Sequence, residues 1–334
     1  MLDELNGRKI AIDAYNMLYQ FLSIIRQPDG MPLTGPSGEV TSHLSGLFYR
    51  TTDMIAKGIT PIYVFDGVPS HLKQQTTMAR MKRRDEARKA YEAAKEREDI
   101  ETMRMKAQQS VRITNEIIDS SRELLSLMGV AHIKAPSEGE AQASAMAAQG
   151  IVYAAASQDY DTMLFGAPTV VRNLSFSGRR KLPRKNVYVN VEPEIMSLGD
   201  TLSSLGLTRQ QLVWIGIMIG NDFNRGIDGI GPKTALKIAK DSTSIDDMIS
   251  KVASRGKSFE SDVHEVEELF MHPEVKNITE GEMEKMLDNK CDIGGVAKFM
   301  CDKHGFSNDR LEKYINVLDK KEQQNRQSNI NKWF

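Results

Sequence analysis

The sequence predicts an α/β protein whose central sheet is mostly parallel and flanked by helices. Apolar runs of strand length recur at Lys9–Asp13, Pro61–Phe65, Val130–Ile133 and Ile151–Ala156. Between them lie longer segments with apolar residues at helical spacing. Strands that alternate with helices are typical of βαβ units, which build parallel sheets. We therefore expect ligands to bind at the carboxyl edge of this sheet.

Two predicted strands near the start of the chain each have an acid at the carboxyl end. The run Lys9–Asp13 ends in an acid before a helix at Tyr15–Ile25. After a second helix at His43–Lys57, the run Pro61–Phe65 is followed by Asp66 and a glycine. A single Asp in this position is most often a helix N-cap. Two of them at the ends of parallel strands also fit a shared site.

Residues 73–112 form a polar segment with little to bury. Its first half, residues 73–89, holds seven basic and two acidic residues, a local charge of +5. Such a segment is either a solvated helix with i,i+4 ion pairs or a helical projection that holds phosphates. A second basic stretch without acids lies at 167–191, around the predicted strands Thr169–Leu174 and Val187–Val191.

Two pairs of acids stand in the central stretch 136–165, with one residue between the members of each pair: Glu138 and Glu140, Asp159 and Asp161. A small-residue helix, for which Ser137 is the expected N-cap, and the strand Ile151–Ala156 separate the pairs. Residues two apart do not share a helix face, so each pair should lie on a turn or at a helix start.

Four carboxylates at one sheet edge repel one another unless a cation lies between them. Hard divalent metals prefer oxygen ligands of this kind, so the stretch predicts a Mg²⁺ site. The alternative for any one acid is an ordinary solvated charge at a helix start. The convergence of Asp13, Asp66 and Asp222 on predicted strand or helix ends favours the metal site.

The stretch Gly226–Lys233 has two glycine turns with apolar residues between them and opens a helix at Thr234–Ala239. An apolar helix at Leu212–Gly220 precedes it. This pattern predicts a helix-hairpin-helix module, whose backbone N–H groups hold phosphates without reading bases. The alternative is a plain turn between two helices.

Composition limits the remaining choices. A chain of 334 residues can form one large α/β domain or two smaller ones. It has no apolar run long enough to span a membrane and no signal-peptide pattern, so we expect a cytoplasmic protein. Two cysteines exclude a disulfide framework. The net charge of −1 says nothing about nucleic acid.

Seven acids, two basic stretches and a phosphate-binding module together indicate a metal-dependent phosphodiesterase that acts on DNA. Such an enzyme must lower the barrier by ~20 kcal/mol, and paired cations are the usual means. The chain also resembles the flap endonucleases of the XPG-type 5′ nucleases, in their archaeal form. The matching runs are GRKIAID13, YVFD66G, APSE138GE140A, SQD159YD161, GND222 and GIGPK.

The resemblance implies a PIN-like 5′ nuclease fold with a helical arch at about 71–115. One nuclease domain, residues 1–319, would comprise an N-terminal region (residues 1–115), an internal region (residues 130–240) with the helix-hairpin-helix at about 212–240, and a C-terminal helical region (residues 241–319). A flexible tail, residues 320–334, would follow. The implied activity is structure-specific 5′ flap cleavage with 5′–3′ exonuclease activity, in Okazaki-fragment maturation and base-excision repair.

The resemblance also implies roles for individual residues. Glu138, Glu140 and Asp159 would hold one Mg²⁺, Asp161 the second, and Asp13, Asp66 and Asp222 would act partly through water, with Mn²⁺ as a substitute. Lys73 and Arg80 would contact the scissile phosphate. A base would stack on Tyr19, and a K⁺ ion would bind near Gly226–Ile230. The implied further DNA contacts are Arg83, Arg84, Gly229, Gly231, Lys233 and Lys237.

The last eight residues resemble the peptide by which such nucleases bind the DNA sliding clamp. Its members here are Gln327, Ile330, Trp333 and Phe334. We expect a monomer that binds 5′-flap DNA and the clamp, and no membrane. Two alternatives remain: an exonuclease or bubble endonuclease of the same superfamily, and a DNA-junction-binding protein with impaired catalysis. The second follows from the short leader Met-Leu-Asp-Glu-Leu, where the family has a Gly after the initiator Met.

Overall fold

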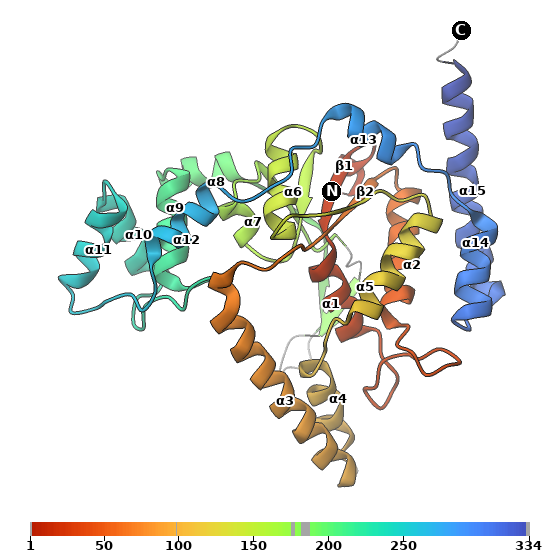
Figure 1. Cartoon of the computed structure of the whole chain (residues 1–334), viewed down its shortest axis with the longest axis horizontal. Helices are drawn as coiled ribbons and strands as arrows, with labels where there is room; N and C mark the ends of the chain where they lie inside the picture. Colours follow the sequence, from red (N-terminus) through yellow and green to blue (C-terminus); the bar gives the residue numbers. More distant parts are fainter. Residues whose placement is uncertain (1, 98, 175–177, 182–187, 332–334) are drawn as a thin grey trace. The chain divides into compact units, whose positions relative to one another are not determined.

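The computed structural model describes residues 2–97, 99–174, 178–181 and 188–331. Six strands form a mixed, mostly parallel sheet in the order β3-β2-β1-β4-β5-β8, which confirms the predicted α/β class (Figure 1). These strands are β1 (Lys9–Asp13), β2 (Thr60–Phe65), β3 (His132–Lys134), β4 (Ala154–Ala156), β5 (Thr169–Arg172) and β8 (Glu194–Ser197). The strand β8, which the sequence did not predict, pairs antiparallel with β5. A separate hairpin pairs β6 (Gly178–Lys181) with β7 (Tyr188–Val191).

The chain forms two compact units. The first comprises Met1–Tyr63, Met81–Ile133 and Ile278–Phe334, and the second comprises Val64–Arg80 and Lys134–Asn277. Helices of the first unit are η1 (Leu2–Leu5), α1 (Ala14–Ile24), α2 (Ser42–Ala56), α4 (Ile100–Gln109), α5 (Asn115–Leu127), α13 (Glu280–Leu287), α14 (Ile293–Ala297), η3 (Lys298–Lys303) and α15 (Asn308–Asn331). Those of the second are η2 (His71–Lys73), α6 (Gly139–Ala148), α7 (Asp161–Leu164), α8 (Leu198–Leu205), α9 (Arg209–Ile219), α10 (Pro232–Asp241), α11 (Ile245–Ala253) and α12 (Val263–Met271). Helix α3 (Gln74–Glu96) runs from the second unit into the first.

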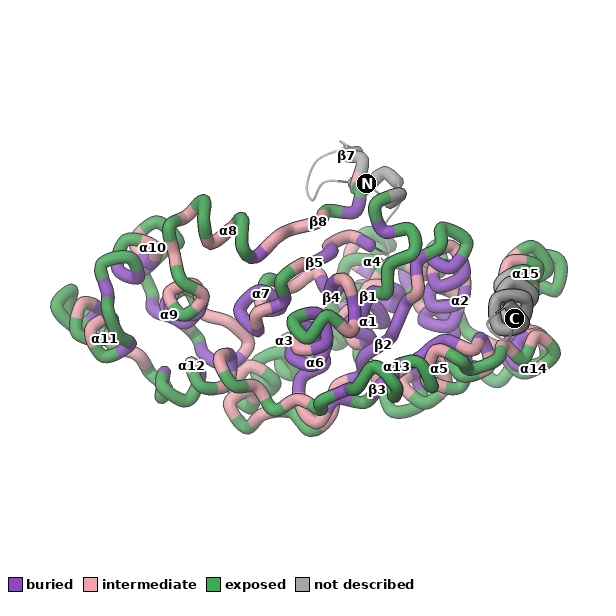
Figure 2. The backbone as a smooth tube through the Cα atoms, turned by 90° about the horizontal axis from the view of Figure 1, so that it is seen from above, coloured by how far each residue is buried: buried purple, intermediate pink, exposed green. Residues whose placement is uncertain are grey.

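In the first unit, β1 and α2 supply much of the buried apolar surface (Figure 2). Ile10 and Ile12 of β1 and Phe48 of α2 are fully buried. Beside Phe48, the ring of Tyr49 packs edge-on against Tyr314 of α15, with 4.7 Å between the ring centres. The long C-terminal helix is thereby attached to this core through aromatic contacts.

Helices α3 and α4 form the segment that the sequence predicted as a solvated helix or a helical projection (Figure 1). Their shared apolar contact is small and consists of Tyr91, Ala94, Met103 and Ala107. The side chain of Asp99 caps α4, because its carboxylate accepts the Thr102 N–H at 3.1 Å. The pair therefore has a local core of its own, although most of its surface is polar.

The core of the second unit is built from α6, α7 and α9–α12 around the fully buried Trp214. Phe165, Phe223 and Phe270 pack as a group, with ring centres 4.8–6.2 Å apart. Phe165 ends α7 and Phe223 follows α9, so this apolar group fixes two segments that carry predicted site acids.

Two expectations differ from the structure. Glu138 rather than Ser137 is the N-cap of α6, because the first N–H of the helix, that of Gly139, is bound by the carboxylate of Asp66. The backbone of α15 continues to Asn331, where the sequence indicated a disordered tail from Lys320. That stretch is rich in Lys, Glu, Gln and Arg, which favour helix, and it lacks Gly and Pro. Across the residues that the structure describes, no helix combines the length and apolar character of a membrane span.

Candidate acidic active site

Six of the seven predicted acids belong to the second unit, and each stands at the end of a strand or near the end of a helix. Asp66 follows β2, Asp159 lies in the loop after β4, and Asp222 lies two residues beyond the C-cap of α9. Glu138 caps α6, Glu140 lies in its first turn, and Asp161 is the first residue of α7. The expectation that each close pair lies at a turn or helix start is confirmed.

Asp13 and Tyr19 belong to the first unit. Asp13 is the last residue of β1 and caps α1 by accepting the Asn16 N–H at 3.0 Å. Asp13 thus has the commonest role of an Asp in this position, that of a helix N-cap. Its side chain is buried, and a buried carboxylate is also a suitable metal ligand.

The start of α6 is attached to the end of β2 through Asp66. The Asp66 carboxylate accepts the Gly139 N–H at 2.7 Å. A Cβ atom added to Gly139 would lie only 2.7 Å from the same carboxylate oxygen. A side chain at position 139 would displace the Asp66 carboxylate from this hydrogen bond. The glycine between Glu138 and Glu140 thus preserves the contact that holds the start of α6.

Ser157 connects three of the acids, and the sequence analysis missed it. Its hydroxyl donates to a Glu140 carboxylate oxygen at 2.5 Å and accepts the Asp159 N–H at 3.1 Å. Asp159 in turn accepts the Asp161 N–H at 3.2 Å. The signal was available, since a Ser two residues before an Asp commonly forms a turn through its hydroxyl. The chain of bonds holds the Asp159–Asp161 turn against α6.

Lys73 and Arg80, for which the resemblance implied a contact with the scissile phosphate, lie beside Glu138 and Asp222. The Lys73 ammonium forms an ion pair with Glu138, lies 3.8 Å from an Asp222 carboxylate oxygen and is 5.0 Å from the centre of the Phe223 ring. Burial would lower the pKa of Lys73, but the neighbouring charges, first that of Glu138, raise it. The Arg80 guanidinium donates to Asp222 at 2.5 Å. Lys73 and Arg80 are both directed toward the acid cluster.

Asp161 shows how crowded the cluster is. Burial, followed by the charges of Asp159 and Asp222, raises the pKa of Asp161 to about 7. A carboxyl group with this pKa is only half ionised at neutral pH, and a bound cation would favour its ionised form. The oxygen donors thus suit a hard divalent metal. Among the described residues, no three His, Cys, Asp or Glu side chains already stand close enough together to hold one ion.

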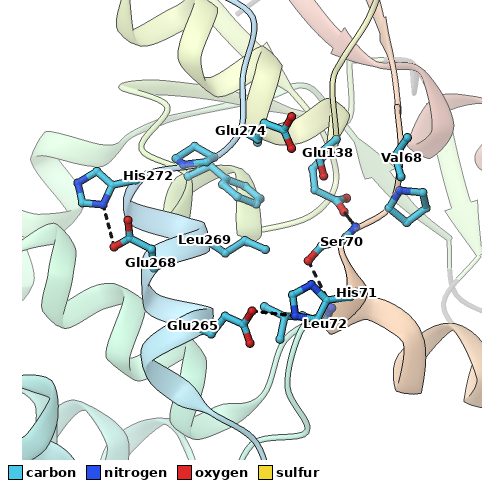
Figure 3. Close-up of a pocket in the computed structure, with 15 residues that line it drawn as sticks. Val68, Ser70, His71, Leu72, Glu138, Glu265, Glu268, Leu269, His272 and Glu274 are labelled. Atoms are coloured by element: carbon cyan, nitrogen blue, oxygen red, sulfur yellow. Dashed lines mark hydrogen bonds and ion pairs between the residues drawn. The ribbon is translucent and has the colours of Figure 1, made fainter.

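A cavity of about 400 Å³ adjoins Glu138 and lies between the 68–72 segment, which includes the start of η2, and α12 (Figure 3). Three further carboxylates line it, those of Glu265, Glu268 and Glu274. Two of them bind histidines: Glu265 lies 2.7 Å from His71, and Glu268 lies 3.0 Å from His272. This concentration of acids disfavours phosphate, so the cavity is not suited to hold a DNA backbone.

A second cavity, of about 330 Å³, lies in the first unit and has the opposite charge. Its charged lining consists of one glutamate, Glu92, and four arginines, namely Arg26, Arg84, Arg88 and Arg112. The Arg84 guanidinium also lies 6.0 Å from the ring centre of Tyr19, which is 38% exposed. Arg83, on the same helix, is exposed. The sequence analysis did not single out Arg26, because it lies far from the basic run in sequence.

The predicted helix-hairpin-helix corresponds to α9, the loop 220–231 and α10. The loop is closely packed: a Cβ on Gly226 would lie 2.4 Å from the Gly220 nitrogen. Gly231 caps α10 without a side-chain acceptor, and Gly229, Lys233 and Lys237 are exposed. The first N–H groups of α10 therefore have no side-chain cap that would compete with a phosphate.

Lys257 also contacts this loop and was missed in the sequence analysis. Its ammonium donates to the Asp228 carbonyl at 2.9 Å. Other predicted groups cannot be placed: Trp333 and Phe334 lie outside the described residues, and only the backbone is described at Gln327 and Ile330.

Family models and known relatives match this chain over most of its length. The XPG N-terminal domain matches residues 1–87, and the XPG I-region matches residues 129–222. The flap endonuclease 1 of Pyrococcus furiosus is 45% identical over 334 residues, which cover 100% of this chain and 95% of the relative.

Solved structures show the same fold. A flap endonuclease-1 from Methanococcus jannaschii matches with a TM-score of 0.70 and 36% identity, over 95% of this chain and 93% of that one. The catalytic core of Rad2 in complex with a DNA substrate matches with a TM-score of 0.65 and 23% identity, over 95% and 94%. By its identity to the Pyrococcus protein over the full length, the chain belongs to the flap endonuclease 1 family of XPG-type nucleases.

Proposed function

We propose that the chain is a structure-specific 5′ flap endonuclease with 5′–3′ exonuclease activity, which hydrolyses DNA phosphodiester bonds where single and double strands meet. The observation that carries the proposal is the acid cluster around Asp161, which Lys73 and Arg80 adjoin, in a chain whose relatives are flap endonucleases. The family is metal-dependent, and we propose two Mg²⁺ ions as the cofactor, with Mn²⁺ as a substitute.

The acids would divide between the two ions. Glu138, Glu140 and Asp159 would hold the first and Asp161 the second, with Asp13, Asp66 and Asp222 acting partly through water. When bound, the metal pair supplies an activated water and charge stabilisation for the leaving oxygen. Ser157 keeps Glu140 and Asp159 at a fixed separation through its two hydrogen bonds.

Lys73 and Arg80 would bind the scissile phosphate. Both are charged donors that already stand at the acid cluster, where a phosphate must enter to meet the metals. Charged donors directed at the transition state contribute most when they are pre-positioned. The ion pairs with Glu138 and Asp222 hold the two side chains at that place.

DNA would be bound away from the chemistry at two places. The hairpin loop and the start of α10 would hold the downstream duplex through Gly229, Gly231, Lys233 and Lys237, with a K⁺ ion near Gly226–Ile230. Tyr19, Arg83 and Arg84 would contact DNA bases and phosphates in the first unit. We also propose the nuclease domain, residues 1–319, as the unit of function.

The cellular role follows from the same reasoning. We propose a cytoplasmic monomer that acts in Okazaki-fragment maturation and base-excision repair, recruited to the sliding clamp through Gln327, Ile330, Trp333 and Phe334. Calorimetry with a synthetic peptide of residues 327–334 and the cognate clamp tests the last point. Absence of heat at micromolar concentrations would refute it.

The activity is tested with a labelled 5′-flap substrate, with and without Mg²⁺, beside single-stranded and blunt duplex DNA. We expect cleavage at the junction that requires the metal and is much slower on both controls. Asp161→Ala serves as the matched inactive variant. Equal cleavage of all three substrates, or cleavage in EDTA, would contradict the proposal.

A further inference from the structure

Tyr160 stands between the two acids of the Asp159–Asp161 pair and is neither a proposed metal ligand nor a proposed DNA contact. Its side chain is 54% exposed, which is unusual for an aromatic residue with a fixed position. It is also the N-cap residue of α7 and caps the helix with no side-chain hydrogen bond. The four-residue helix that begins with Asp161 therefore depends on contacts from outside itself.

Arg172 of β5 supplies such a contact. Its guanidinium carbon lies 4.3 Å from the centre of the Tyr160 ring, and the same group donates to the Tyr160 hydroxyl at 2.5 Å. The first contact is a cation–π interaction and the second a charge-assisted hydrogen bond, so two different forces hold one side chain. Tyr160 is thus fixed at both the face and the tip of its ring.

Arg172 is itself held by the sheet. It stands directly opposite Glu194 in the antiparallel β5–β8 ladder, and the two side chains lie 3.5 Å apart. Its Nε is buried and donates to no acceptor in the described structure. An unsatisfied buried donor costs stability, so the contacts with Tyr160 and Glu194 must outweigh that cost to keep the side chain here.

The backbone around Tyr160 connects this contact to the acids. The Tyr160 carbonyl accepts the Met163 N–H at 2.9 Å, and the Thr162 hydroxyl donates to the Asp159 carbonyl at 3.1 Å. On the other side, Ser157 connects Asp159 to Glu140. The turn is therefore held at one end by α6 and at its centre by β5.

We propose that Arg172 and Tyr160 form a brace that fixes the separation of the Asp159 and Asp161 carboxylates, and thereby sets the affinity of the site for divalent metal. Both are positioning residues, since neither supplies a metal ligand. The inference rests on the proposed metal-dependent function. Outer residues that orient metal ligands typically change metal affinity by about 10- to 100-fold when they are replaced.

The test measures the affinity of the full chain for Mn²⁺ without DNA by isothermal titration calorimetry. Arg172→Gln removes both contacts to Tyr160, whereas Tyr160→Phe keeps the ring and removes only the hydroxyl. Arg255→Gln is the matched control, because it neutralises an exposed arginine of the same unit and leaves Arg172, Tyr160 and Glu194 unchanged. We expect Mn²⁺ affinity to fall about tenfold for Arg172→Gln, by about threefold for Tyr160→Phe, and by less than about twofold for the control.

Thermal unfolding in EDTA separates this role from a purely structural one. If Arg172 only stabilises the sheet edge, Arg172→Gln will unfold at a lower temperature while Mn²⁺ affinity stays at the wild-type value, and the brace is refuted. Unchanged Mn²⁺ affinity with weaker flap binding would refute it too, in favour of a DNA contact. If the wild-type chain binds no Mn²⁺ at all, the metal centre fails as well, which distinguishes failure of the proposed function from failure of the brace alone.

Discussion

Two of the cavities in the described structure, one in each unit, are similar in size and opposite in charge. The cavity beside Glu138 in the second unit measures about 400 Å³ and is lined by four glutamates, whereas the one in the first unit measures about 330 Å³ and is lined by four arginines and one glutamate. Both have apolar residues among the charged ones. Volume alone would nominate either as a DNA site, so the charge of the lining must decide between them.

The difference indicates a division of tasks. Under the proposed function, the acids beside Lys73 would hold metal ions, and the arginines of the second cavity would hold the phosphate backbone. Lys73 and Arg80 are the exception, because they are cations within the acidic region. Mutations should therefore affect either DNA binding or the cleavage rate. Lys73 and Arg80 are expected to be intermediate, because they would bind the phosphate at the place where it is cleaved.

The largest effect is expected at the centre of the acid cluster. Asp161→Ala or Glu140→Ala should abolish flap cleavage and leave flap binding within about tenfold, because removal of an acid lowers repulsion toward phosphate. Single-turnover cleavage and fluorescence anisotropy measure the two quantities. Loss of binding together with loss of the folded state would remove the distinction between the two regions.

The second-largest effect on cleavage is expected at Lys73 and Arg80. Replacement of Lys73 or Arg80 by Ala should lower the single-turnover rate by roughly 10²–10³, as for the loss of one donor to a transition state. Saturating enzyme should not restore the rate. A defect that disappears at saturation would instead assign both residues to binding, the role proposed for Arg83 and Arg84.

The two units should also respond to pH in opposite directions. In EDTA, the raised pKa of Asp161, about 7 against 3.8 unfolded, means that the folded chain binds more protons between these values. Its contribution to stability is present at low pH and is lost as pH rises toward 7, by on the order of 4 kcal/mol. We expect Asp161→Asn to flatten this loss in chemical denaturation across about pH 4.5–7.5.

The first unit supplies the control for that prediction. Burial lowers the pKa of His43 to about 3, so the unfolded chain binds more protons below pH 6.5. The contribution of neutral His43 is present above about pH 6.5 and is lost as pH falls. His43→Gln should reduce the acid sensitivity and leave the Asp161 effect intact; a shared response would show that the two effects are not independent.

The smallest effect should come from neutralising one charge in either cavity. Arg84→Gln should weaken flap binding several-fold and reduce the slope of binding against salt by about one, with no change in rate at saturation. Glu265→Gln, the matched change in the acidic cavity, should not weaken binding. Equal loss in both variants would show that cavity charge does not decide where DNA binds.

Local patterns predicted the acids well and their supports poorly. Asp66, Asp159 and Asp222 stand out because each follows a short apolar element, a signal contained within about ten residues. Ser157 was visible within the same window and was overlooked. Arg172 and Lys257 could not be found in this way, since their partners lie 12 and 29 residues away and depend on how the strands and helices pack.

The same limit explains the errors in the fold. The β8 strand, Glu194–Ser197, is short and contains a single strong β-former, so pairing with β5 rather than its own sequence makes it a strand. Ser137 has the usual chemistry of a cap, but Asp66 from a distant strand occupies the N–H that it would have bound. In both cases a long-range contact outweighed local preference.

The small apolar contact between α3 and α4 has a consequence for local stability. Four side chains, Tyr91, Ala94, Met103 and Ala107, are the buried contact that these two helices share. A cluster of this size contributes far less than the main core, so the helix pair should open locally at a free energy well below that of global unfolding. In amide hydrogen exchange, the amides of α3 and α4 should therefore exchange together and early, while those of α2 and β1 remain protected.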